Sequence, residues 1–417
     1  MQSMPRKKTF NLRADLERFT SHETDPPQRT RIEAARVGEH TYPRFINAFW
    51  TARQRQACSL HEVAYRACFK PQLPRFFIER LTQPGDTVYD PFAGRGTTIL
   101  EAGLLGRQII ANDINPLSAI LAQPRFCIPD PRDLQTRLAA IPFDPDARAD
   151  CDLAMFYHPQ TLAELASLRN YLRAQAQRGA SDQLDAWIRM VATNRLTGHS
   201  SGFFSVYTLP PNQAVSPASQ RRINRTRAQT PPYRDTRAII LKKSRQLIKE
   251  LSAPEIENLR RAGARAQFLA CDARATRAIA NGAVQLTVTS PPFLDIVQYA
   301  QDNWLRCWFN EIDAEQVAQR MTQARTLDEW RAVMGAVFAE LYRITRRGGW
   351  VAFEVGEVRH GKINLDEHVV ALGIAAGFEC HGVLINQQTF TKTANIWGVA
   401  NNTRGTNTNR VGLFRKA

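Results

Sequence analysis

The segment from residue 86 to residue 113 constrains the fold of this chain more than any other. It begins with a short apolar stretch that ends in Asp90, continues through a turn with two glycines, and then has helical periodicity over 98–105. A second apolar stretch, 108–113, follows directly. A strand, a glycine turn, a helix and a second strand in this order are the building unit of a parallel sheet covered by helices. The segment therefore predicts an α/β fold.

Three further apolar stretches with strand character follow at 266–272, 284–289 and 349–355. Helical segments separate them, so the alternation of strand and helix continues through the second half of the chain. Alternation of this kind predicts a mostly parallel sheet with helices on both faces. Near the C-terminus, segments at 382–390, around 396–399 and at 411–414 predict a closing antiparallel hairpin.

The strand pattern is interrupted between the second and third strands. Residues 153–200 have helical periodicity, residues 201–236 are rich in Pro, Ser, Asn and Arg and indicate a loop, and residues 237–262 indicate a basic helix. We interpret 126–254 as a region inserted into the α/β domain. That domain then comprises residues 1–125 and 255–417.

The N-terminal part of the chain has weaker signals. Residues 1–40 are polar and lack a clear period, so we expect little regular structure there. A helix is expected from Pro74 to Leu81. Asn115, which Pro116 follows, predicts the N-cap of the helix after the second strand.

The net charge of the chain points to a class of partner. Its 417 residues include 55 Lys and Arg against 39 Asp and Glu, a formal net charge of +16. A surplus of this size favours a polyanionic partner such as a nucleic acid. An ordinary basic soluble protein is the alternative, so the position of the charge matters more than its total. Between 221 and 245 nine basic residues accompany a single acid, Asp235.

Cysteine usage and hydropathy exclude several other classes. The seven cysteines are scattered and form no Cys-x-x-Cys pair, which argues against a zinc site or a disulfide framework and for a reducing cytoplasm. The chain has no apolar run of membrane-spanning length, and its first ten residues do not resemble a secretory signal. We therefore expect a cytoplasmic protein with no bound metal and no membrane partner.

The glycine turn has the character of a ligand site. Gly94 and Gly96 permit a tight turn and the close approach of a ligand, and N–H groups at the helix start can face a carboxylate or phosphate. Three strands end in an acid: Asp90, Asp113 and Asp272. Ligands of open α/β sheets bind at this carboxyl edge, where an acid after the second strand typically binds two ribose hydroxyls. A glycine turn or a capping Asp is ordinary by itself, but the set predicts a cofactor that carries adenosine. Asp90 would lie near its amino-acid end, Asp113 at the ribose and Asp272 near the adenine amine.

The fourth strand ends in a second informative stretch, Thr-Ser-Pro-Pro-Phe at 289–293. An exocyclic base amine is a poor nucleophile because its lone pair is delocalised into the ring. Acceptors that bond both N–H groups favour the nucleophilic, tetrahedral nitrogen, and the Ser290 hydroxyl and Pro291 carbonyl can supply them. Pro291 and Pro292 restrict the backbone, and Phe293 offers a flat face on which an extruded base can stack. A proline-rich loop without a chemical role is the alternative, which the glycine turn upstream disfavours.

Together these stretches resemble the DNA amino-methyltransferases of restriction–modification systems. DPFAGRGTT, residues 90–98, is similar to the family's cofactor motif, and SPPF, residues 290–293, to its catalytic motif. ACFKPQLP, residues 67–74, resembles the motif that often precedes the glycine turn. The resemblance covers residues 60–125 and 265–415.

The resemblance implies a Rossmann-like seven-stranded methyltransferase sheet whose last strand is antiparallel, with helices on both faces and a large helical and loop insertion. It also implies S-adenosyl-L-methionine as the methyl donor and flipping of the target base. The residues expected at the cofactor are Lys70, Pro71, Asp90, Phe92, Gly94, Gly96, Thr97, Thr98, Asp113 and Asp272. The residues expected to be catalytic are Ser290, Pro291, Pro292 and Phe293.

Ser290 bears on which base is modified. Members of the family that methylate cytosine N4 usually carry Ser at this position, whereas adenine N6 enzymes usually carry Asp. The residue therefore favours cytosine N4, with adenine N6 as the alternative. The motif order, with the glycine turn first and SPPF after the insertion, departs from the commonest cytosine N4 arrangement. A C5-cytosine mechanism would need a Pro-Cys nucleophile, which the sequence lacks.

The inserted region is expected to recognise double-stranded DNA. Arg and Lys can neutralise phosphates, and Arg can also bond guanine edges. The preceding stretch, 199–212, mixes aromatic and small polar residues as a loop approaching bases would; a solvated surface is the alternative for the basic run. We expect a monomer in a prokaryotic cytoplasm, associated with DNA and functionally paired with a separate restriction endonuclease. The residues expected to contact DNA are Arg221, Arg222, Arg225, Arg227, Arg234, Arg237, Lys242 and Lys243.

Two other interpretations remain open from the sequence. The same core methylates base amines in ribosomal or transfer RNA in other enzymes, although no recognisable RNA-binding module is appended. In the second interpretation, the chain is a DNA-binding protein that kept the fold without catalysis. The intact SPP and glycine motifs argue against it.

Overall fold

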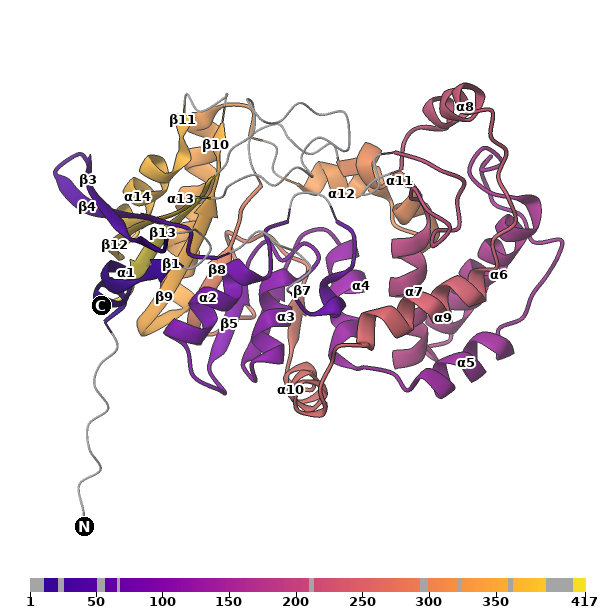
Figure 1. Cartoon of the computed structure of the whole chain (residues 1–417), viewed down its shortest axis with the longest axis horizontal. Helices are drawn as coiled ribbons and strands as arrows, with labels where there is room; N and C mark the ends of the chain where they lie inside the picture. The colour runs from indigo at the N-terminus through magenta and orange to yellow at the C-terminus, as the bar shows by residue number, and fades with distance from the viewer. Residues whose placement is uncertain are drawn as a thin grey trace, which may run out of the picture.

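The computed structural model describes residues 11–21, 26–50, 57–65, 68–209, 214–292, 299–321, 324–358, 363–387 and 408–417. Its main feature is a nine-stranded sheet in the order β3-β4-β12-β13-β9-β8-β5-β6-β7 (Figure 1). The strands are β3 (Arg31–Val37), β4 (His40–Asn47), β5 (Thr87–Asp90), β6 (Gln108–Asn112), β7 (Gln267–Leu269), β8 (Val284–Thr289), β9 (Thr345–Val355), β12 (Glu379–Gln387) and β13 (Thr408–Arg415). Two short ribbons pair β1 (Thr20–Ser21) with β2 (Gln28–Arg29) and β10 (Glu357–Val358) with β11 (Ile363–Asn364).

Five adjacent strands of the sheet, β7, β6, β5, β8 and β9, pair in parallel. All six residues of β8 are buried, as expected for a central strand covered on both faces. β13 is antiparallel to both of its neighbours, β9 and β12. The predicted α/β fold and its antiparallel last strand are therefore confirmed. The part of the C-terminal hairpin predicted around 396–399 lies outside the described residues.

The hairpin of β3 and β4 was not among the predicted strands; β3 lies within residues 1–40, which were expected to be partly without regular structure. β4 adds in parallel to β12, with Ile46 opposite Ile385, so the seven predicted strands are extended to nine. Arg44 of β4 bonds Asp366 and Glu367 at distances of 3.2 and 2.9 Å, which attaches the hairpin to the rest of the sheet. β3 is an edge strand with mostly exposed residues on both faces. No alternation of apolar and polar residues therefore marks it in the sequence.

Helices cover both faces of the sheet, and alternate strand residues face opposite sides. Val88 and Leu286 pack in one core cluster with the helices α2, α3 and α10, whereas Tyr89 and Phe353 pack in the other with α13 and α14. The helices are α1 (Leu12–Arg18), α2 (Gln72–Leu81), α3 (Thr97–Leu104), α4 (Leu117–Ala122), α5 (Pro131–Ala140), α6 (Pro159–Gln177), α7 (Gln183–Arg195), α8 (Pro217–Thr226), α9 (Thr236–Ile248), α10 (Ala253–Gly263), α11 (Tyr299–Asn310), α12 (Ala314–Arg320), α13 (Leu327–Ile344) and α14 (Leu365–Ala375), with 3-10 turns η2 (Ser59–His61) and η3 (Gln123–Phe126).

The helices α5 to α9 gather at one end of the molecule, beyond the edge strand β7 (Figure 1). Trp187 of α7 is fully buried there, and its Nε1 donates to the Ser244 hydroxyl of α9 at 2.9 Å. Two expectations were wrong in detail. Part of the predicted loop 201–236 forms the helix α8, and the predicted basic helix is divided into α9 and α10, because Ser252 starts a new helix with a capping box.

Candidate active site

Four strand ends define the site at the carboxyl edge of the parallel strands. Asp90 is the last residue of β5, Asp113 follows β6, and Ser290 follows β8. Asp272 lies three residues beyond the end of the short strand β7. Asn112 links the ends of β6 and β7, because its Nδ2 donates to the Cys271 carbonyl at 2.9 Å and its Oδ1 accepts from the Cys271 N–H at 3.1 Å. The predicted convergence on one edge is therefore present.

The glycine turn is shaped to receive a ligand next to Asp113. Gly94 and Gly96 adopt positive φ angles of 51° and 79°, which favour glycine. A Cβ on Gly96 would lie 2.8 Å from the Cβ of Ala122, so this position also requires the small residue. Asp113 accepts from the Gly94 N–H at 2.7 Å and from the Asn115 N–H at 2.9 Å. Burial raises the pKa of the Asp113 carboxyl to about 6.

Asn115 differs slightly from its predicted role. Pro116 occupies the N-cap position of α4, one residue later than expected. The Asn115 side chain nevertheless bonds the helix start, because its Oδ1 accepts from the Leu117 N–H at 3.0 Å.

The Asp90 side chain connects the turn after β5 with the end of β8. Its side chain is buried, and it accepts from the Phe92 N–H at 3.1 Å and from the Thr289 hydroxyl of β8 at 2.7 Å. Thr98 makes a second connection to β8 through the Val288 carbonyl, at 3.0 Å. Burial raises the pKa of Asp90 to about 7. These contacts give Asp90 a role in aligning β5 with β8.

The pKa of Asp90 gives a testable dependence of stability on pH. A carboxyl whose pKa is raised by folding binds its proton more tightly in the folded state, so the stability it contributes is lost as pH rises from about 4 through about 7. Asp90→Asn should therefore show a smaller decline in unfolding free energy between pH 5 and pH 7.5 than the unmodified protein. The difference should reach a few kcal/mol at most, since one pKa unit corresponds to about 1.4 kcal/mol. Urea unfolding of both cofactor-free proteins measures it, and parallel pH profiles would contradict the assignment.

The remaining predicted cofactor residues lie around this turn with defined partners. Asp272 is partly exposed and its carboxylate is bonded by Arg274 at 2.5–3.0 Å, which holds the pKa of Asp272 below its usual range. Thr97 is buried and accepts from Arg95 Nε at 3.2 Å. Pro71 is the N-cap of α2, and the Lys70 carbonyl accepts from the Leu73 N–H at 3.1 Å.

Ser290 is next to a carboxylate that the sequence analysis did not single out. Glu354 lies on β9, one residue beyond Phe353, which pairs with Thr289 of β8. The Asn409 amide donates to the Glu354 side chain at 3.0 Å, and the neighbouring Ser290 side chain lowers the pKa of the Glu354 carboxyl, partly offsetting the effect of burial. Glu354 is only 6% exposed, and burial raises the pKa of its carboxyl. The sequence feature that could have identified Glu354 is the presence of one acid within the otherwise apolar stretch Gly-Trp-Val-Ala-Phe-Glu-Val.

The two prolines after Ser290 are held in different ways. Pro291 is buried, whereas Pro292 is exposed and its carbonyl accepts from Trp330 Nε1 of α13 at 3.2 Å. The loop that begins at Ser290 is thus anchored to a helix on the face opposite α3. Phe293, the fourth predicted catalytic residue, lies outside the described residues.

Most of the predicted DNA-contacting residues lie at the surface, but not all of them. Arg222, Arg225, Arg227 and Lys242 are exposed, and the Arg227 guanidinium stacks over the Tyr207 ring at 3.8 Å. Arg234 is half-buried. The other three side chains have protein partners: Arg221 pairs with Asp152 at 2.6 Å, the Arg237 guanidinium donates to the Ile141 carbonyl at 2.6 Å, and Lys243 pairs with Glu62 at 2.9 Å.

Two corrections follow for the inserted region. Lys243 is on the inner face of α9, where it is 6% exposed and its ammonium is compensated by Glu62, so it is not available to phosphates. The aromatic stretch predicted to approach bases instead packs inward: Phe203 is 7% exposed and Phe204 is fully buried. Both residues supply core contacts because the loop folds back onto the end of α7, where the Arg195 carbonyl accepts from the Phe204 N–H at 3.0 Å.

A cavity of about 740 Å³ lies away from this edge, between α4, α7 and α10. None of the predicted cofactor or catalytic residues lines it. Among the described residues, no group of three or more His, Cys, Asp or Glu side chains is placed to hold a metal ion. No helix of the described part combines the length and the apolar composition needed to cross a membrane.

Comparison with known proteins finds similarity over the N-terminal part of the chain. Residues 6–122 match the family model described as DNA methylase, N6_N4_Mtase. The matched segment contains the glycine turn and Asp113, and it ends well before Ser290. Over this segment the chain is similar to the DNA methylases that the family model describes.

Several known methyltransferases are similar to parts of the chain. It is 37% identical over 62 residues to the Type II methyltransferase M.MjaII of Methanocaldococcus jannaschii, covering 15% of this chain and 12% of that protein. It is 32% identical over 116 residues to the Type II methyltransferase M.BsoBI of Geobacillus stearothermophilus, covering 26% and 22%. The matched regions thus span less than a quarter of these relatives. A DNA modification methylase from Thermus thermophilus, solved in complex with S-adenosyl-L-methionine, is similar over 35% of this chain and 53% of that chain, at 22% identity and a TM-score of 0.21.

S-adenosyl-L-methionine, the cofactor of such methyltransferases, fits the residues at this edge. The partly buried Asp113 is placed as an acceptor beside the turn, where it already accepts from the Gly94 N–H. An acid in this position after the second strand matches the chemistry of a ribose with two hydroxyls.

Proposed function

We propose that this chain is a site-specific DNA methyltransferase that transfers a methyl group from S-adenosyl-L-methionine to the exocyclic amine of a flipped base. One observation carries the proposal: Ser290 follows β8 directly beside the buried Glu354, while Thr289, one residue earlier, bonds Asp90 under the cofactor turn. The acceptor loop and the donor turn are therefore attached to each other through buried hydrogen bonds, one from Thr289 to Asp90 and one from Thr98 to the Val288 carbonyl.

The donor half is proposed to hold the cofactor through backbone and carboxylate groups. Asp113 would accept from the ribose hydroxyls, and the N–H groups at the start of α3 would face the amino-acid end. Lys70, Pro71 and Phe92 would complete the wall of the site, and Asp272 would lie near the adenine. When bound, the cofactor supplies an electrophilic methyl group.

The acceptor half is proposed to prepare the amine as a nucleophile. One N–H of the base amine would donate to the Ser290 oxygen and the other to the Pro291 carbonyl, which localises the nitrogen lone pair. In this proposal the Ser290 hydroxyl would donate its proton to the neighbouring Glu354, which would leave the hydroxyl oxygen as an acceptor for the base amine. The nitrogen would bond the methyl carbon as the carbon–sulfur bond of the donor breaks and its electron pair goes to the sulfur; the nitrogen would then release one proton to solvent.

Cytosine N4 is the base amine we propose, because Ser290 is the residue that the resemblance associates with this target; adenine N6 is the alternative. Phe293 would provide the stacking face for the flipped base. The chain would act as the modification enzyme of a restriction–modification system, functionally paired with a separate endonuclease.

DNA as the substrate is supported by the exposed basic face of the inserted region, 126–254. On α8, Gln220 and Asn224 face inward, donating to the Tyr207 and Met155 carbonyls at 3.1 and 2.7 Å. The arginines of the same helix, Arg222 and Arg225, are exposed. One face of α8 is therefore fixed to the protein while the other presents positive charge. In Figure 1, α8 is at the top, the side to which β10 and β11 also extend.

Neutralising this face should weaken DNA binding. The triple change of Arg221, Arg222 and Arg225 to Gln should reduce affinity for duplex DNA roughly tenfold or more at moderate salt and flatten the dependence of log K on log salt by about one unit per lost phosphate contact. Fluorescence anisotropy with a labelled duplex measures both. The control is Arg260→Gln, an exposed arginine of α10 outside the inserted region. An unchanged salt slope would place DNA binding elsewhere.

The proposed function has a direct test. The protein is incubated with methyl-labelled S-adenosyl-L-methionine and either duplex DNA or total RNA, and genomic DNA from expressing cells is then mapped with a method that distinguishes N4-methylcytosine from N6-methyladenine. Label in DNA as N4-methylcytosine is expected. N6-methyladenine would replace the base assignment, label in RNA alone would overturn DNA as substrate, and no cofactor binding would overturn the enzyme assignment.

A further inference from the structure

The segment from Ser59 to Tyr65, which we call the bridge segment, runs beside the glycine turn and is bonded along almost its whole length. Ser59 donates its N–H to Glu250 at 3.0 Å and its hydroxyl to the Leu247 carbonyl at 2.9 Å, both in the region after α9 begins. At the other end, the Ala64 carbonyl accepts from Asn194 and from Arg306, each at 3.1 Å. The segment therefore joins the inserted helices to the α/β domain.

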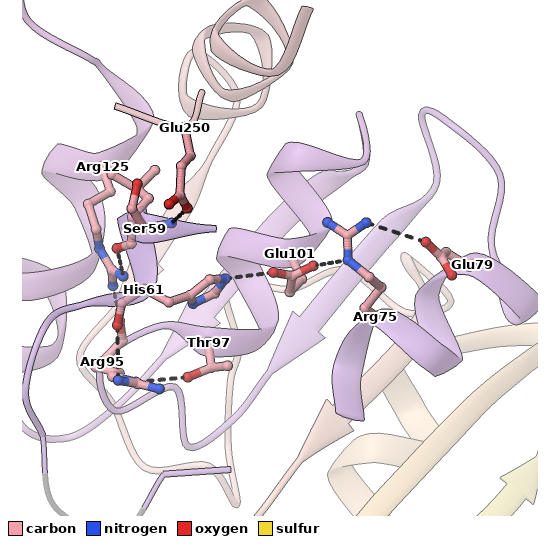
Figure 2. A network of polar contacts seen from close by, with 10 residues as sticks. Ser59, His61, Arg75, Glu79, Arg95, Thr97, Glu101, Arg125 and Glu250 are labelled. Atoms are coloured by element: carbon pink, nitrogen blue, oxygen red, sulfur yellow. Dashed lines mark hydrogen bonds and ion pairs between the residues drawn. The ribbon is translucent and has the colours of Figure 1, made fainter. Parts of the chain in front are cut away.

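Two buried arginines fix the bridge segment to the cofactor turn. Arg95, the residue between Gly94 and Gly96, donates to the carbonyls of His61 at 3.1 Å and Val63 at 3.0 Å. Arg125, which is fully buried, donates to the Leu60 carbonyl at 3.2 Å and also to the carbonyl of Arg95. Figure 2 shows both guanidinium groups directed at this segment. The turn and the segment thus form one rigid unit.

A chain of hydrogen bonds holds the same segment to α3, the helix that begins after the turn. His61 Nε2 lies 2.6 Å from Glu101 of α3, and Glu101 in turn accepts from Arg75 of α2 at 2.6 Å (Figure 2). His61 and Glu101 are each 1% exposed. A buried carboxylate with two partners of this kind is costly to move, because any displacement would leave it uncompensated.

Tyr65 is the side chain that this rigid unit presents to the cofactor edge. Its hydroxyl accepts from Asn115 Nδ2 at 2.8 Å, and the Asn115 N–H bonds Asp113 at 2.9 Å. Its ring lies over the turn, since a Cβ added to Gly94 would be 3.4 Å from the Tyr65 Cε1. Gly94, Asp113, Asn115 and Tyr65 therefore form a closed ring of contacts, and Tyr65 remains partly exposed within it.

We propose that Tyr65 is a cofactor-contacting residue, with its ring against the glycine turn and its hydroxyl proton directed to the ribose side of the adenosine group. The inference rests on the proposed function, since the ligand is S-adenosyl-L-methionine. The hydroxyl oxygen is occupied as an acceptor for Asn115, which leaves its own proton to be donated. The bonds to the bridge segment keep the ring in place before the ligand arrives, so little ordering is needed on binding.

The test compares Tyr65→Phe, Tyr65→Ala and the unmodified protein in calorimetric titrations with S-adenosyl-L-methionine and with 5′-methylthioadenosine, which lacks the amino-acid end. Tyr65→Phe should raise the dissociation constant of both ligands by roughly fivefold to tenfold, the effect expected for one lost hydrogen bond. Tyr65→Ala should raise both further, because the ring contact is also lost. The control is Tyr171→Phe, which removes a hydroxyl bonded to Asp185 in the inserted region at 3.1 Å and should change neither constant.

Each outcome separates this inference from the proposed function. Absence of cofactor binding by the unmodified protein would overturn the proposed function itself. Binding by the unmodified protein with no change in Tyr65→Phe would overturn only the inference. An affinity loss for S-adenosyl-L-methionine but not for 5′-methylthioadenosine would refute the ribose-side position. Thermal unfolding without ligand checks whether Tyr65 has a purely structural role. If Tyr171→Phe lowered the melting temperature and the cofactor affinity as much as Tyr65→Phe does, the inference would also be overturned.

Discussion

Ser290→Ala is expected to lower the rate of methyl transfer by roughly two orders of magnitude while the affinity for S-adenosyl-L-methionine stays nearly unchanged, as expected when one preorganised acceptor is lost. The reason lies in the position of the hydroxyl. It follows β8 beside the buried Glu354, where in the proposed mechanism its oxygen accepts an N–H of the base amine. Alanine removes that acceptor and leaves a buried carboxylate with one partner fewer. Single-turnover rates with labelled cofactor and saturating DNA measure the loss.

Two companion variants separate a catalytic role from a structural one. Ser167→Ala removes a hydroxyl that accepts from the Asp144 N–H at 3.0 Å, far from the site, and should leave the rate unchanged. Glu354→Gln keeps the volume and a hydrogen-bonding group but removes the charge, so it should slow transfer less than Ser290→Ala does. Full activity of Ser290→Ala would refute the assigned role. A comparable loss in Ser167→Ala would show that the assay reports stability instead.

Asp113→Ala is expected to raise the dissociation constant of S-adenosyl-L-methionine roughly a hundredfold or more. Hydrogen bonds to a charged group are worth about 1.5–3 kcal/mol each, and a carboxylate at the ribose would make two. The change also removes the acceptor of the Gly94 N–H at 2.7 Å and of the Asn115 N–H at 2.9 Å, so the turn loses two stabilising hydrogen bonds. Isothermal titration with the cofactor measures the effect.

Asp272→Ala is the matched control for that experiment. Its carboxylate follows a neighbouring strand at the same edge, but it is 41% exposed and already paired with Arg274. We therefore expect a loss of less than about tenfold, since an exposed, compensated carboxylate contributes less to binding. If Asp272→Ala impaired binding more than Asp113→Ala, the assignment of the ribose to Asp113 would be wrong.

The sequence was sufficient for the α/β fold and for the elements that position the site. Strong apolar runs such as 108–113 and 284–289 identify buried parallel strands, because such strands are covered on both faces and need no alternation. The hairpin of β3 and β4 was missed for the converse reason: an exposed edge strand has no apolar face to mark it. The inward packing of Phe203 and Phe204 was missed because the residue pattern of an aromatic loop is the same whether its side chains face DNA or the core.

The residues of the candidate site also fall into those that the sequence could reveal and those that it could not. Local chain geometry determined what the sequence could reveal: glycines that require positive φ, an acid at a strand end, and prolines that restrict a loop are all properties of neighbouring residues. The sequence by itself therefore determined the parallel part of the sheet, the glycine turn and the proline loop after β8.

Only the tertiary structure decided which side chains meet. Glu354 reaches Ser290 because β9 pairs beside β8, and Tyr65 reaches Gly94 and Asn115 because buried arginines hold the bridge segment against the turn. The same packing buries Lys243 and places the Asp90 side chain where it accepts from the Thr289 hydroxyl. These contacts join residues far apart in the chain, and burial and pairing depend on the whole fold, so no local pattern in the sequence encodes them.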